Sequence, residues 1–174
     1  PESWLGGLDK IYRLHKWFGI ASLVLAVMHW LWAKGPKWAV SLGLLERSAR
    51  GPRAPRAPVE DALEQFLLAQ RHTAESLGEW AFYAAVLLIV VALVRLIPYR
   101  WFYRTHRVIA AVYLVLVFHT VVLLQFSDWV MPLGAVMAAL LASGTVAAVL
   151  VLLRRVGAWR RVQGQITSLH YYPE

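Results

Sequence analysis

The chain contains no cysteine, and this absence excludes disulfide bonds, thiolate metal sites and cysteine-ligated iron–sulfur clusters. Acidic residues are also few, with 10 Asp and Glu against 18 Lys and Arg, which leaves a net charge of +8. Such an excess could indicate nucleic-acid binding. Here, however, the arginines lie at the ends of apolar segments, where lipid headgroups would meet them. We therefore expect no nucleic-acid partner.

Charged residues are nearly missing from four long apolar segments. The chain has 174 residues, of which 59% are hydrophobic and only 16% charged, a composition unlike that of a soluble domain. A helix needs about 20 apolar residues to cross a bilayer. The segments that reach or approach this length are Ile11–Ala33, Leu77–Ile97, Trp101–Phe126 and Trp129–Leu153. They predict an all-α membrane protein, a transmembrane helix bundle with four spans and with lipid as its partner.

Basic residues predict the orientation of the four spans. They lie before the first span, between the second and third, and after the fourth, positions that share one side if the spans alternate: Arg13, Lys16, Arg95, Arg100, Arg104, Arg107, Arg154, Arg155, Arg160 and Arg161. The short turn on the other side, Gln125–Trp129, carries only Asp128. Because short cytoplasmic loops are enriched in Lys and Arg, both termini are expected in the cytoplasm.

The segment 34–76 between the first two spans is expected to be external. Its stretch Arg50–Pro58 reads as a linker rich in Pro and Arg, without a core-forming pattern. The following stretch Val59–His72 places apolar residues among acidic ones and predicts a short amphipathic helix. That helix would either lie on the external membrane interface or form a solvated cap.

Two pairs of histidines lie inside or at the ends of these apolar segments. His15 and His29 are about 21 Å apart along a helix axis, and His106 and His119 are about 19.5 Å apart, so their depths match. An imidazole in hydrocarbon is costly unless something binds it. Since the first and third spans run in the same direction, His15 and His106 share the cytoplasmic level, and His29 and His119 the outer level. Each pair could clamp one haem iron through neutral imidazole nitrogens.

Helical geometry complicates this arrangement for the third span. His106 and His119 are 13 residues apart, so on an ideal helix their side chains point in directions that differ by about 140° around the axis. For both rings to face the first span, we expect the third helix to be distorted or to begin irregularly near His106. A single histidine in a span is also often a helix–helix hydrogen-bond partner or part of a proton relay. His72 and His170 are expected to be ordinary surface residues.

Small and basic neighbours fit a flat anionic cofactor. Small residues that would leave room for a macrocycle are Gly19, Ala21, Ser22, Ala26, Ala110 and Ala111. Basic residues that could pair with haem propionates or with the phosphates of a flavin are Arg13, Lys16, Arg104 and Arg107.

The motifs LHKWFGIASLVLAVMH and THRVIAAVYLVLVFH resemble the ferric reductase and NADPH oxidase superfamily, which pairs H-x13-H on one helix with H-x12-H on another. The similarity includes LDKIYRLHK, and the tail GQITSLHYYPE resembles the start of the flavin-binding β-barrel of that family. It covers almost the whole chain apart from the linker, and the chain looks most like bacterial NADPH oxidase-like predicted ferric reductases.

The resemblance implies a six-helix domain with two b-type haems, of which the four spans match helices three to six. Residues 1–157 would form this haem domain, with the external linker 34–76, and residues 158–174 would begin the barrel. The first two helices and the dehydrogenase domain are absent from this sequence, so we expect a portion of a longer protein. By the same resemblance, His15 and His106 hold the inner haem, and His29 and His119 the outer haem.

The implied activity is an oxidoreductase of the bacterial inner membrane. Electrons would pass from cytoplasmic NADPH and FAD through both haems to an external acceptor, either dioxygen, giving superoxide, or a ferric chelate. Ala33 stands where many eukaryotic oxidases have a further histidine, and Tyr113 lies between the two haem levels, either as an intervening aromatic or as a packing residue. Two alternatives remain: a haem-bearing anchor for a separate redox subunit, and a transporter that uses histidines for a proton or a divalent metal.

Overall fold

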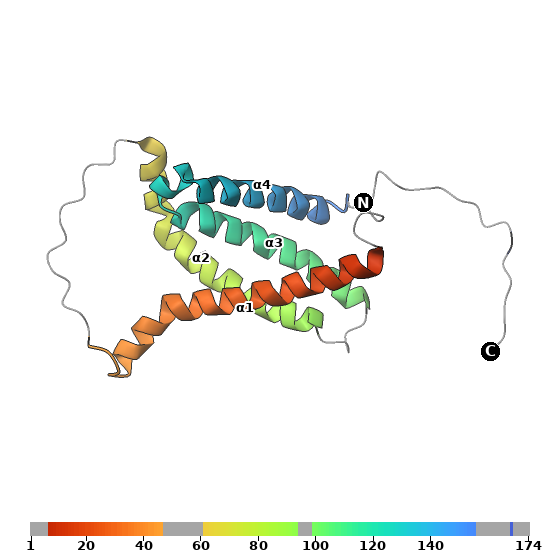
Figure 1. The fold of residues 1–174 in the computed structure, drawn as a ribbon, viewed down its shortest axis with the longest axis horizontal. Helices are drawn as coiled ribbons and strands as arrows, with labels where there is room; N and C mark the ends of the chain where they lie inside the picture. The colour runs from red at the N-terminus through yellow and green to blue at the C-terminus, as the bar shows by residue number, and fades with distance from the viewer. Residues whose placement is uncertain (1–6, 47–60, 94–98, 156–167, 169–174) are drawn as a thin grey trace.

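A computed structural model describes residues 7–46, 61–93, 99–155 and 168. Within these residues the chain forms helices and no strands: α1 (Leu8–Ser41), α2 (Ala62–Leu93), α3 (Tyr99–Leu123), the short 3₁₀ helix η1 (Phe126–Val130) and α4 (Pro132–Leu152). The four α-helices are long and apolar enough to cross a membrane, and Figure 1 shows them as an elongated bundle. The prediction of an all-α transmembrane bundle is confirmed.

Small residues occupy the places where the helices pack closely. Helix α3 contacts α2 and α4, while α1 contacts α2. The buried residues are mostly alanine and glycine: Ala74, Gly78 and Ala81 on α2, Ala110 on α3, and Gly134 and Ala148 on α4. Large apolar side chains such as Trp32 (86% exposed) face outward. This is the usual arrangement of membrane helices, which pack through small residues and present large apolar side chains to lipid.

Two helices extend further than the sequence predicts. Helix α1 continues past Ala33 and through Pro36 to Ser41, because a membrane-associated helix tolerates one proline that removes a single backbone hydrogen bond. The described parts of the predicted amphipathic helix (62–72) and of the predicted second span (77–93) belong to one helix, α2. Asp61 precedes it and accepts hydrogen bonds from the backbone N–H groups of Leu63 (2.7 Å) and Glu64 (3.2 Å), which is an N-cap arrangement. The segment 34–76 is therefore helical at both ends, and its Arg50–Pro58 stretch lies outside the described residues.

The turn between α3 and α4 is tightly built around a glycine. Helix η1 fills the turn, and Pro132 stands in the first turn of α4, where its missing N–H costs no helical hydrogen bond. Gly134 lies against the backbone of Asp128 and Trp129, and a Cβ atom at this position would overlap both.

We expect Gly134→Ala to lower the free energy of unfolding by about 1–3 kcal/mol, because backbone atoms cannot move aside as a flexible side chain can. Thermal unfolding in detergent measures the effect. Gly35→Ala on α1 is the matched control, since a Cβ there meets no atom within 4 Å. An unchanged unfolding midpoint for Gly134→Ala would contradict the packing of this turn.

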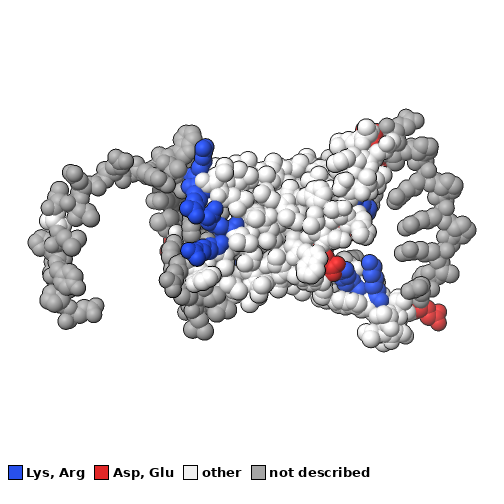
Figure 2. Space-filling view, turned by 180° about the vertical axis from the view of Figure 1, so that it is seen from behind, with Lys and Arg blue, Asp and Glu red and all other residues white. Residues whose placement is uncertain are grey.

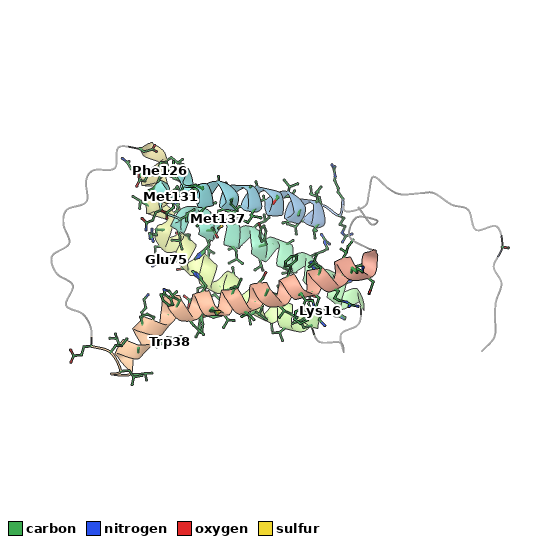
Figure 3. All side chains as sticks on the ribbon, viewed as in Figure 1. Lys16, Trp38, Glu75, Phe126, Met131 and Met137 are labelled. Carbon is green, nitrogen blue, oxygen red and sulfur yellow. The ribbon has the colours of Figure 1, made fainter. Side chains whose placement is uncertain are left out.

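Charge is distributed unequally between the two ends of the bundle. In Figure 2, Lys and Arg gather at the end where α1 begins and α4 ends. The opposite end carries fewer basic groups, with acidic groups beside them. We call the first the basic end. Figure 3 shows Lys16 toward the basic end, with Glu75, Phe126 and Met131 at the other.

Candidate functional site

His15 and His106 face each other near the basic end. His15 lies on α1 and His106 on α3, and their ring centroids are 5.7 Å apart with an interplanar angle of 73°. The His15 side chain is exposed and His106 is half-buried. The structure thus brings together two imidazoles that are far apart in the sequence, as the spacing predicts.

This donor set fits a haem iron. In the described part of the chain there is no group of three or more His, Asp or Glu side chains that could enclose a bare metal ion. Iron in a porphyrin already has its equatorial ligands, so two imidazoles complete its coordination. Gly19 lies one helical turn after His15, and a Cβ atom built on it meets nothing within 4 Å, so no neighbouring atom crowds α1 at this position.

The other two histidines are oriented differently. His119 lies on α3 and turns toward α2, where its Nδ1 donates a hydrogen bond to the carbonyl oxygen of Ala74 over 2.8 Å. Its ring also lies against Gly78. His29 is exposed on α1, and among the described residues no hydrogen bond or ring contact joins it to His119. A direct ring contact therefore joins the first pair and not the second.

The regularity of α3 explains this difference. We expected a distortion near His106, and this expectation is wrong, because α3 is a continuous α-helix from Tyr99 to Leu123. The angular offset of about 140° between its two histidines is therefore kept. The His106 ring meets His15 on α1, and the Nδ1 atom of the His119 ring meets α2.

The four basic residues predicted to bind a cofactor all lie near the basic end. Arg13 pairs with Asp9 at 3.5 Å, and the Arg104 guanidinium lies 5.8 Å from the ring centroid of Trp101. Arg107 reaches across to α4, where its Nη2 donates to the carbonyl oxygen of Leu152 at 2.9 Å. Lys16 is exposed on α1. Their role toward propionates or phosphates stays a prediction.

Tyr113 lies at the interface of α3 and α4. Its hydroxyl is against Gly144, and a Cβ atom on that glycine would overlap it. This contact supports a packing role for Tyr113, which is one of the two interpretations that the sequence leaves open.

An ion pair that the sequence analysis did not anticipate joins α1 to α2 away from the basic end. Lys34 Nζ donates to Glu79 Oε2 at 2.7 Å, and the Tyr83 hydroxyl donates to Glu79 Oε1 at 2.8 Å. Both charged side chains are about one-third exposed, at 29% and 34%. The available signal was Glu79 itself, a carboxylate between apolar neighbours that needs a partner at membrane depth.

Aromatic rings surround this ion pair. The Trp30 ring stacks on Phe82 at a centroid distance of 5.4 Å, and meets Trp38 at 4.9 Å and Tyr83 at 6.1 Å. Because Trp30 directly follows His29, the cluster fixes the part of α1 that carries this histidine against α2.

Comparison with known proteins identifies the family. The model of the family described as "Ferric reductase like transmembrane component" matches residues 2–117. This range includes α1, α2 and most of α3, contains His15, His29 and His106, and ends two positions before His119. No curated protein and no solved structure matches the chain. Since the family match covers more than half of the chain, and four helices are able to span a membrane, the chain belongs to the ferric reductase-like transmembrane family, an oxidoreductase family of integral membrane proteins associated with transmembrane electron transfer.

Proposed function

We propose that the chain conducts electrons across a membrane through two b-type haems, the inner one bound by His15 and His106 and the outer one by His29 and His119. The observation that carries the proposal is the facing pair of imidazoles on α1 and α3, 5.7 Å apart between ring centroids. Family membership supports it, because the family match contains both residues of this pair.

Each haem would supply a one-electron carrier, and the protein would supply its placement and insulation. Neutral imidazole nitrogens of His15 and His106 would bind the iron from both sides and leave no open coordination position. Apolar helices would exclude water from the sites. Arg13, Lys16, Arg104 and Arg107 lie near the basic end, where they would attract propionates or flavin phosphates.

The basic end is proposed to face the cytoplasm of a bacterium, across its inner membrane, with both termini on that side. A cytoplasmic dehydrogenase domain would deliver electrons from NADPH through FAD at this end, and residues 158–174 would begin its flavin-binding barrel. Apart from Ser168, these residues lie outside the described part of the chain. The acceptor, dioxygen or a ferric chelate, would be reduced at the opposite end.

The test is a dithionite-reduced absorption spectrum of the purified protein, together with its haem-to-protein ratio. We expect sharp low-spin haem b bands and two haems per chain. Colourless protein would refute the proposal and favour the transporter alternative. Full-length reduced protein is then mixed with oxygen or ferric citrate to identify the acceptor. Absence of NADPH oxidation by the full-length protein would favour the anchor alternative.

A further inference from the structure

We propose that α2 positions the fourth histidine: the Ala74 carbonyl oxygen and the space at Gly78 hold the His119 ring so that its Nε2 is presented as a ligand. The inference rests on the proposed function, and it assigns a role to two residues of a helix that carries no predicted haem ligand. It begins from the 2.8 Å hydrogen bond between His119 Nδ1 and Ala74 O.

The hydrogen bond determines the tautomer of His119. A carbonyl oxygen can only accept, so the proton of the neutral ring must be on Nδ1. The lone pair is then on Nε2, which is the arrangement that metal-binding histidines have when a carbonyl accepts from their other nitrogen. Ala74 is fully buried, which protects this bond from competing water.

Gly78 provides the space for the ring. It lies one helical turn after Ala74 on the same face of α2, and a Cβ atom there would overlap the Nδ1, Cε1 and Cγ atoms of His119. Any larger residue would displace the imidazole from the Ala74 carbonyl. The two α2 residues therefore act together, one as hydrogen-bond acceptor and one as cradle.

The expected consequence concerns ligand strength as well as placement. Hydrogen bonding from the second ring nitrogen makes the ligating nitrogen more basic, and loss of such partners commonly weakens metal binding by about 10–100-fold. A more basic ligand stabilises ferric over ferrous iron. Loss of the Ala74 bond should therefore raise the midpoint potential of the outer haem and leave that of the inner haem unchanged.

The first experiment is Gly78→Ala in the full-length protein. We expect loss of the outer haem, or a raised midpoint potential for it in a redox titration, while the inner haem is unaffected. Gly144→Ala is the matched control, because its methyl group also enters an α3 interface but meets Tyr113 instead of a histidine. Both haems retained with unchanged potentials in Gly78→Ala would overturn the proposal.

A second pair of variants tests the hydrogen bond without a steric change at Gly78. In His119→Asn the side-chain amide can donate from the place of Nδ1, whereas in His119→Gln its nitrogen is closer to the place of Nε2. Both variants should lose the outer haem, but the asparagine variant should have the higher thermal unfolding midpoint. Equal midpoints would overturn the role of Ala74. Absence of haem from the unmodified protein would instead refute the proposed function, and the comparison of asparagine with glutamine would still report on the hydrogen bond.

Discussion

Replacing His106 with leucine should reduce the haem content from two per chain to one and abolish electron transfer to an external acceptor. His106 and His15 provide the two faces of one proposed coordination site, with ring centroids 5.7 Å apart. A single remaining imidazole leaves the iron weakly held, and electrons from the cytoplasmic side then have no first carrier. Pyridine haemochrome quantification and acceptor reduction by the full-length protein measure the two effects.

The same site predicts non-additive behaviour. His15→Leu should have the same effect as His106→Leu. The double variant should lose no more haem or electron transfer than either single variant, since each single change already removes the proposed inner haem site. His72→Leu is the control, because this histidine is exposed on α2. Retention of both haems in His15→Leu and His106→Leu would disprove the ligand assignment.

Reversing the charge of Glu79 should detach α1 from α2 away from the basic end. In Glu79→Lys two ammonium groups would meet where Lys34 and Glu79 now pair at 2.7 Å, and the Tyr83 hydroxyl would lose its acceptor. Because His29 precedes Lys34 on α1 by little more than one turn, we expect reduced occupancy of the outer haem and a thermal unfolding midpoint lower by several degrees. Haem quantification and thermal unfolding in detergent measure these changes.

A variant with the two charges exchanged distinguishes loss of the Lys34–Glu79 ion pair from other effects of the substitution at Glu79. Lys34→Glu combined with Glu79→Lys should recover most of the stability and haem content. Glu75→Lys provides a matched reversal one turn earlier on α2, at a side chain that is 57% exposed and pairs with Arg71 at 3.5 Å. Its effect should be small, as is typical of exposed ion pairs. Equal losses from Glu75→Lys and Glu79→Lys, or no recovery in the swapped protein, would contradict the role of this ion pair.

The existence of the helices could be predicted because hydrophobic length is a strong signal. A bilayer requires about 20 apolar residues per span, and four segments approach or meet that length. Their bounds were less predictable. Apolar length cannot show that α1 continues through Pro36, or that Asp61 starts a helix that runs without a break into the next span. Helical hydrogen bonding continues beyond the apolar core wherever no residue stops it.

The meeting of His15 and His106 could be predicted, but the direction of the His119 ring could not. A rise of about 1.5 Å per residue gives the histidines of α1 and of α3 nearly equal separations along their helices, and the rings of His15 and His106 do face each other. For His119, the neighbour is decided by which helix lies on that side of α3, and the spacing of histidines contains no such information. The place of Gly78 beside the His119 ring is seen only in the structure, because one glycine in an apolar segment does not indicate which side chain lies against it.

The Arg107 side chain connects α3 to the end of α4. This residue follows His106 and is tied by its hydrogen bond to Leu152 in the final turn of α4, where the chain leaves the bundle. This bond therefore couples the last turn of α4 to the turn of α3 that carries His106, so a displacement of either turn would be passed to the other.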